Sequence, residues 1–286
     1  MRPSRVKLFV PAIRVVGFIA AIGILVVMAI RAARTLDLHD ITWWPLPLAF
    51  VGATAWWLLG ARSWAILVAG RASRQDISIW CRTQAFRYLP GGIWAPAARA
   101  VAIPGGVVDR VSIVVADNAI ALCAALAIGS AAFVATGGVR WLPVVAVIGV
   151  PTLVSRWAVR RTRMSANRTF RATWNYLIAF AVYSLAAVLV QAAVSGLQDP
   201  LAVAGAAAIA WSAGFVVVIV PSGVGVREVV YVGLLSSALP TGEAEAAALI
   251  LRGLTTIAEL AVLLVVTGTT LTARTPVDET TASRQG

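Results

Sequence analysis

Charged side chains stand inside apolar stretches of this sequence, where an uncompensated charge is costly. Asp117 lies within the apolar stretch 111–136, and Arg252 and Glu259 lie seven residues apart, on one helix face, within 246–271. A charge at the centre of a bilayer costs at least about 2.5 kcal/mol, so such residues usually form pairs or serve a substrate path. Two interpretations stay open: buried ion pairs that hold helices together, and a polar path for a charged head group.

A segment rich in glycine and proline interrupts the apolar sequence in the N-terminal half. It reads Arg87-Tyr88-Leu89-Pro90-Gly91-Gly92-Ile93-Trp94, and Arg99 follows it. Proline and the Gly-Gly pair disfavour a continuous helix. Irregular backbone at membrane depth is tolerated only where protein buries it or where it lines a watery cavity. We therefore expect residues 84–100 to be non-helical or re-entrant.

A second such segment lies in the C-terminal half and reads Pro221-Ser222-Gly223-Val224-Gly225-Val226-Arg227-Glu228. Broken helices in corresponding places of two halves are typical of transporter binding sites and indicate an internal pseudo-repeat. Glycine-rich backbone and an adjacent guanidinium can bind a phosphate. We expect residues 219–230 to be non-helical or re-entrant and to approach residues 84–100 in the interior. The alternative is two ordinary cytoplasmic turns.

These two segments resemble the signature segments of the lysylphosphatidylglycerol synthase transmembrane region, the flippase-like membrane domain of the multiple peptide resistance factor proteins. The second segment is the more specific match, because the family usually reads Pro-Gly-Gly-x-Gly-x-Arg-Glu there; Ser222 replaces one glycine. The family's first segment often has a lysine near the Gly-Gly pair, where this chain offers only Arg87 and Arg99. The resemblance implies a lipid or lipid-linked glycan translocase, or an accessory to one. The soluble aminoacyl-transfer domain of full-length relatives is expected to be absent.

The composition excludes an ordinary soluble protein. Of 286 residues, 60% are hydrophobic and only 13% are charged, and the mean hydropathy is +0.87. A soluble domain of this size has too little interior to bury so much apolar surface. The net charge of +12 does not indicate nucleic-acid binding, because arginines in the cytoplasmic loops of a bacterial inner-membrane protein account for it.

The hydropathy pattern predicts an all-α, polytopic transmembrane bundle of about eight spans, with six as the fallback. The predicted spans are 10–30, 45–69, 111–136, 141–159, 173–195, 201–220, 224–239 and 246–271. Residues 1–272 are expected to form this flippase-like domain, and 273–286 a short disordered tail. Arginines gather in alternate connections, as in 156–171, which places both termini in the cytoplasm.

The tryptophans are assigned two structural roles. Those at span ends are expected to anchor the protein at the membrane interface: Trp43, Trp44, Trp141 and Trp174. Those inside spans are interpreted as lipid-facing or packing aromatics rather than as stacking platforms: Trp56, Trp57, Trp64 and Trp211.

The sequence favours a transporter over an enzyme. Its only histidine is His39, and Cys81 and Cys123 lack metal-ligand spacing, so we expect no catalytic centre, metal, cofactor or disulfide. The predicted function is a flippase or transporter for a phospholipid or polyprenyl-linked glycan; the alternative is a non-catalytic membrane partner of a glycosyltransferase or lipid synthase. Homo-oligomerisation stays open. The candidates for the head-group site or substrate path are Arg87, Tyr88, Pro90, Gly91, Gly92, Arg99, Asp117, Pro221, Ser222, Gly223, Gly225, Arg227, Glu228, Arg252 and Glu259.

Overall fold

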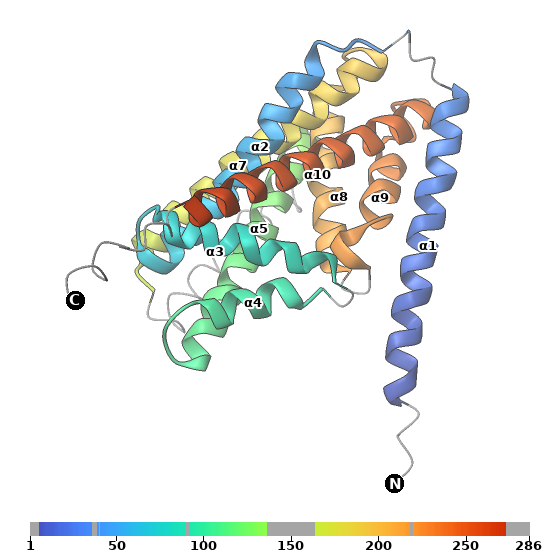
Figure 1. Cartoon of the computed structure of the whole chain (residues 1–286). Coiled ribbons are helices and arrows are strands. Elements are labelled where there is room, and N and C mark those ends of the chain that lie inside the picture. The colour runs from blue at the N-terminus through green and yellow to red at the C-terminus, as the bar shows by residue number, and fades with distance from the viewer. Residues whose placement is uncertain are drawn as a thin grey trace, which may run out of the picture.

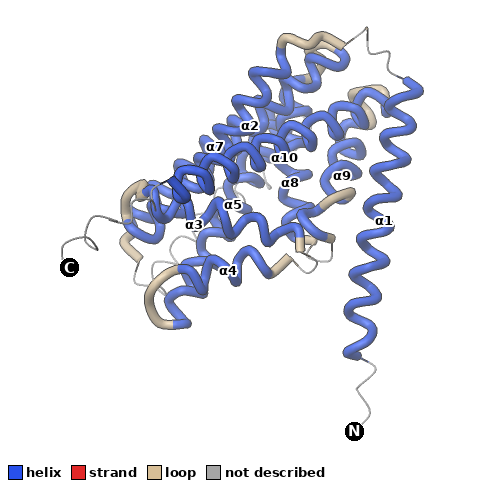
Figure 2. Tube along the Cα trace, in the orientation of Figure 1, coloured by secondary structure: helices blue, strands red, loops and turns tan. Residues whose placement is uncertain are grey.

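The computed structural model describes residues 6–35, 39, 41–89, 92–135, 164–217 and 220–272. Within these ranges every regular element is a helix, as Figure 2 shows, and the prediction of an all-α fold is confirmed. The α-helices are α1 (Val6–Thr35), α2 (Pro45–Ala69), α3 (Arg74–Gln84), α4 (Trp94–Ala102), α5 (Val107–Ala135), α7 (Ala166–Ser195), α8 (Pro200–Val216), α9 (Val226–Leu235) and α10 (Thr241–Thr272). Two 3-10 helices, η1 (Ala85–Tyr88) and η2 (Pro221–Gly223), lie at the two glycine- and proline-rich segments.

Four of the described helices are long and apolar enough to cross a membrane: α2, α5, α7 and α10. The chain is therefore a membrane protein. The bounds of α2 coincide with the predicted span 45–69, whereas the predicted span 141–159 lies outside the described residues. The prediction of a span over 224–239 is wrong in length, because α9 has 10 residues and is only about 15 Å long. The helix ends at Leu235, and Ser236 and Ser237 follow in turns.

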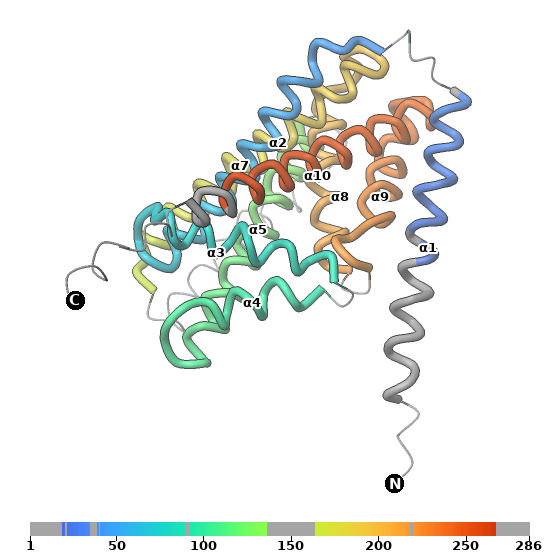
Figure 3. Tube along the Cα trace, in the orientation of Figure 1, coloured from blue at the N-terminus to red at the C-terminus, as the bar shows by residue number. Residues whose placement is uncertain are grey.

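The bundle is built on close helix pairs (Figures 1 and 3). α2 runs beside α7, α5 packs on α8, and α1 stands at one side of the molecule against α10. Glycine permits the α5–α8 approach: a Cβ on Gly205 would lie 3.0 Å from the carbonyl oxygen of Gly129 and 2.8 Å from Phe133. Small residues allow such contact between membrane helices, where packing rather than the hydrophobic effect drives association.

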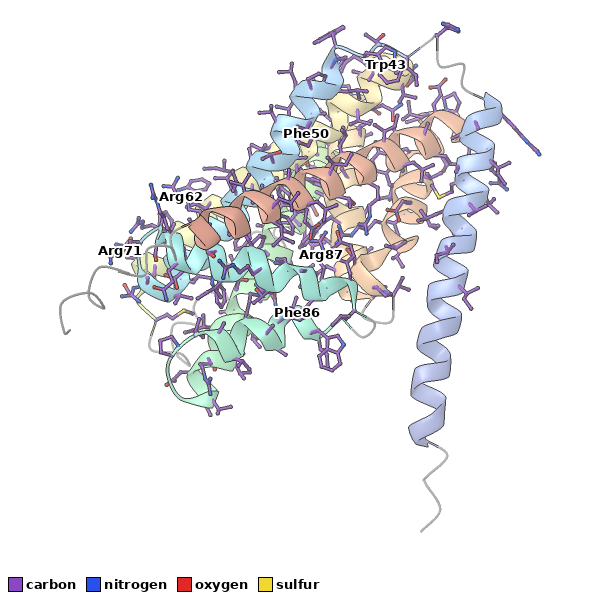
Figure 4. The ribbon with its side chains drawn as sticks, viewed as in Figure 1. Trp43, Phe50, Arg62, Arg71, Phe86 and Arg87 are labelled. Atoms are coloured by element: carbon purple, nitrogen blue, oxygen red, sulfur yellow. The ribbon has the colours of Figure 1, made fainter. Side chains whose placement is uncertain are left out.

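The two ends of the α2–α7 pair differ in chemistry. At one end Arg168 and Arg171 of α7 donate to the carbonyl oxygens of Val68 and Gly70, at 3.3 and 3.2 Å. At the other end the backbone N–H of Thr42 donates to Ala193 over 2.8 Å, close to exposed Trp43 and Trp44. In Figure 4, Arg62 and Arg71 lie toward the first end and Trp43 lies at the second. The exposure of Trp43, Trp44 and Trp174 agrees with an interfacial role; Trp141 lies outside the described residues.

The first glycine- and proline-rich segment breaks the helix over fewer residues than the sequence predicts. Of the two alternatives expected for 84–100, non-helical or re-entrant, the non-helical one is wrong for α4, which begins at Trp94 and continues to Ala102. Pro96 does not break α4, because proline is tolerated in the first turn of a helix, where the backbone N–H has no intrahelical partner. Pro90 and Gly91 lie outside the described residues.

The second segment is a tight turn with left-handed backbone. Ser222, Gly223 and Gly225 have φ of 55°, 64° and 82°. Such values favour glycine. They give a physical reason why the family that this segment resembles usually has a glycine where this chain has Ser222. The helix resumes at Val226, so of the two alternatives expected for 219–230, non-helical or re-entrant, the non-helical one is wrong from that residue onward. η1 and η2 are in contact, and the prediction that the two segments meet is confirmed.

Candidate functional site

A cavity of about 400 Å³ lies where the two broken segments meet. Its walls come from α2, α3, α4, α5, α7, α8 and α9, together with residues of η1 and η2 and their flanks. The apolar lining is largely aromatic and includes Trp56, Phe180 and Phe215. Mostly apolar walls with a few polar groups are typical of ligand pockets of this volume.

A buried ion pair closes one side of the cavity. Arg99 of α4 donates to Oδ2 of Asp117 over 2.5 Å and to Oδ1 of Asn118 over 3.0 Å. The hydroxyl of Tyr176 on α7 donates to the other carboxylate oxygen of Asp117 over 2.6 Å. Arg99 is 3% exposed and Asp117 1%. The arrangement fixes α4, α5 and α7 relative to one another.

A second ion pair joins η1 to α10. Nη2 of Arg87 lies 2.6 Å from Oε2 of Glu259, and the hydroxyl of Tyr88 donates to the same oxygen over 2.9 Å. Burial raises the pKa of the Tyr88 hydroxyl, so Tyr88 stays protonated at neutral pH and continues to donate. Arg87 lines the cavity and Glu259 lies behind it.

A third, looser pair holds the second broken segment. Nε of Arg252 on α10 lies 3.8 Å from Oε1 of Glu228, and its Nη2 donates to Oγ of Ser222 over 3.2 Å. The other carboxylate oxygen of Glu228 accepts the backbone N–H of Gly225 over 2.7 Å and so caps α9. These contacts stabilise the turn that carries Arg227.

Arg227 is the exception among these arginines. It lines the cavity, yet no hydrogen bond or ion pair joins it to another residue that the structure describes, and its Nε is buried without an acceptor. The intramembrane carboxylates Asp117 and Glu259 do not pair with Arg227, because Arg99 and Arg87 occupy them. The interpretation of buried ion pairs that hold helices together is confirmed for Asp117 and Glu259, but their partners Arg99 and Arg87 come from the first broken segment and not from the spans.

The tryptophans assigned to lipid contact or packing have a further role. The guanidinium carbons of Arg87, Arg99 and Arg227 lie 4.9, 5.4 and 5.5 Å from the ring centres of Trp57, Trp64 and Trp211. All three indoles are buried, which agrees with the interpretation of these tryptophans as packing aromatics, and each also lies against an arginine. A cation over a desolvated indole gains about 2 kcal/mol, which offsets part of the cost of burying it.

The structure brings together about half of the predicted site residues. Those that line the cavity are Arg87, Gly92, Arg99, Asp117, Ser222, Gly223 and Arg227. Those that lie outside its lining are Tyr88, Pro221, Gly225, Glu228, Arg252 and Glu259. Sequence reasoning missed Tyr176, which lies 59 positions from its partner Asp117, and Gly214, whose role depends on a contact between α8 and α9. No sequence pattern marks either residue.

Other site chemistry is sparse in the described part of the chain. No group of three or more histidine, cysteine, aspartate or glutamate side chains is placed to hold a metal ion there, and Cys81 and Cys123 are free buried thiols. Comparison with known proteins finds no protein-family model and no curated protein that matches this sequence. The case for function therefore rests on the geometry of the cavity.

Proposed function

We propose that this protein is a lipid flippase or transporter of the bacterial plasma membrane. Its substrate is a phospholipid or a polyprenyl-linked glycan whose head group passes through the cavity while its acyl chains stay in lipid. The observation that carries the proposal is a cavity of about 400 Å³ among apolar helices, which residues of both broken segments line. Arg227 also lines it and has no counter-anion among the residues that the structure describes. A charge at membrane depth marks a substrate path more often than a structural feature.

The proposal includes a bundle of about eight spans with an internal pseudo-repeat and both termini in the cytoplasm. Its support is the arginine-rich connections of the sequence and the contact between one broken segment from each half. The resemblance to the flippase-like family supports the same conclusion, since residues of both signature segments line the cavity: Gly92, Ile93, Ser222, Gly223 and Arg227.

The test is leaflet-resolved lipid labelling in cells with and without the protein. We expect loss of the protein to shift at least one lipid between leaflets, and the wild-type chain to restore its distribution. Arg227→Lys should remain inserted and fail to restore it, because an ammonium cannot replace the planar two-pronged donor. Arg62→Lys is the matched control, since Arg62 is exposed on α2 and does not line the cavity, and it should restore the distribution.

Two outcomes would reject the proposal. One is an unchanged lipid distribution in cells that lack the protein. The other is full restoration by Arg227→Lys, which would leave Arg227 without a role in transport. If the distribution is unchanged while a membrane glycosyltransferase or lipid synthase loses activity, the alternative of a non-catalytic partner takes its place.

A further inference from the structure

The charges around the cavity leave one positive charge uncompensated. Three arginines are matched by three carboxylates, and Arg227 has none among the described residues. The matched pairs are Arg87–Glu259, Arg99–Asp117 and Arg252–Glu228. A bound anion of a single charge would complete the balance, whereas a dianion would replace a positive excess by a negative one.

The fully buried side-chain atoms that lack a partner on lining residues are hydrogen-bond donors. In the described part of the chain, five buried N–H groups on lining residues have no acceptor: Nε1 of Trp57 and Trp80, and Nε of Arg87, Arg99 and Arg227. The unpartnered buried acceptors belong to residues outside the lining. A buried donor without a partner costs about 1–3 kcal/mol. These five atoms are themselves occluded from the cavity, but their N–H dipoles and the guanidinium charges make it favour an anionic ligand such as a phosphate.

We propose that the cavity binds the phosphodiester of a lipid with a single net negative charge, and that Arg227 is its guanidinium ligand. This inference rests on the proposed function and narrows its substrate class. A polyprenyl diphosphate carries more negative charge than Arg227 balances. A zwitterionic phospholipid would bring an ammonium into a site where Asp117 already accepts from Arg99 and Tyr176.

The aromatic walls disfavour a sugar-rich head group. Trp211 and Phe215 stack with ring centres 5.2 Å apart and planes 13° apart, and both line the cavity beside Arg227. A glycerol backbone can lie against such rings, while a sugar-rich head group would leave many hydroxyls facing apolar surface without partners. The site therefore combines one cation with apolar contact.

Calorimetric titration of the purified full chain in detergent tests the proposal. The probes are dioctanoyl phosphatidylmethanol, dioctanoyl phosphatidylcholine, farnesyl diphosphate and inorganic phosphate. We expect phosphatidylmethanol, the monoanionic diester, to bind at least about tenfold more tightly than each of the others, the effect of one charge-assisted hydrogen bond. Equal or tighter binding of farnesyl diphosphate or phosphatidylcholine overturns the proposal. Equal binding of inorganic phosphate assigns the site to free phosphate and also overturns it.

Two variants separate the charge from the fold. Arg227→Gln should weaken phosphatidylmethanol binding about tenfold or more, and Arg62→Gln, its matched control, should leave the affinity unchanged. Glu259→Gln frees the Arg87 charge, so it should shift preference toward farnesyl diphosphate. If Arg227→Gln does not fold, the affinity of Arg227→Lys for phosphatidylmethanol and the order of the four probes on the wild-type chain still test the proposal. An unchanged affinity in Arg227→Gln, or an unchanged preference in Glu259→Gln, overturns the proposal.

Calorimetry measures binding without translocation, so the proposed ligand class and the proposed transport function can be rejected independently. Loss of the phosphatidylmethanol preference in a protein that still moves lipid in cells rejects only this inference. A retained preference in a protein that leaves the lipid distribution unchanged rejects the proposed function.

Discussion

At the scale of single residues, the partner of each arginine distinguishes a structural role from a ligand-binding one. Arg99 makes hydrogen bonds to Asp117 and Asn118 and is 3% exposed, so its charge is used inside the protein. Arg227 lines the same cavity with no carboxylate partner among the described residues. The same residue type therefore has opposite consequences for stability at the two positions.

Neutralising these two arginines should change stability in different directions. Arg99→Gln leaves the Asp117 carboxylate buried without its cation, and such a change costs about 3–5 kcal/mol. Arg227→Gln orphans no carboxylate and removes an uncompensated charge, so stability should be unchanged or higher. Thermal unfolding of both variants in one detergent measures the difference. A large loss in Arg227→Gln would mean that Arg227 has a structural partner after all.

At the scale of elements, the position of Arg227 depends on close contact between α8, η2 and α9. A Cβ on Gly223 would lie 2.5 Å from the carbonyl oxygen of Gly214, and one on Gly214 would lie 2.7 Å from Nε of Arg227. Real Cβ atoms do not approach other atoms so closely, so both positions require glycine. The turn can present Arg227 to the cavity only while these two backbones touch.

Gly214→Ala should therefore displace Arg227 and separate α8 from the turn. We expect lower thermal stability and loss of lipid movement in the leaflet assay, because the side chain of Arg227 must leave its place over Trp211. Gly253→Ala is the matched control, since a Cβ there meets nothing within 4 Å and alanine favours a helix by about 1 kcal/mol. Equal behaviour of the two variants would contradict the proposed role of Gly214.

The sequence predicts the elements better than it predicts their contacts. Hydropathy alone places α2 at 45–69, because a span has a strong and local apolar pattern. It fails for α9, which ends at Leu235 before two serines, whereas the predicted span continues to residue 239. The partners of Asp117 and Glu259 were not predictable, since Tyr176 and Arg87 lie 59 and 172 positions away and only the folded bundle brings them near.

At the scale of the whole molecule, the chemistry of the two ends suggests how the bundle lies in the membrane. The N-terminal end of α7 carries Arg168 and Arg171, which contact the C-terminal end of α2. The opposite end of the α2–α7 pair has exposed Trp43 and Trp44 and the loop that contains Asp199. Positive charge concentrates on the cytoplasmic side of bacterial membrane proteins, so the arginine-rich end should face the cytoplasm.

Single cysteines at the two ends of α7 test this orientation. Cys81 and Cys123 are buried, and replacing both with alanine gives a background in which exposed Asn167 and Gln198 can each be changed to cysteine. A membrane-impermeant maleimide added to intact cells should modify Gln198→Cys and not Asn167→Cys. The reason is that α7 has 30 residues and is about 45 Å long, so it can span the bilayer between these two positions. Permeabilised cells should label both, which controls for reactivity. Labelling of Asn167→Cys alone in intact cells would show the opposite orientation, with the arginine-rich end outside. The charge asymmetry would then not be the physical cause of the orientation.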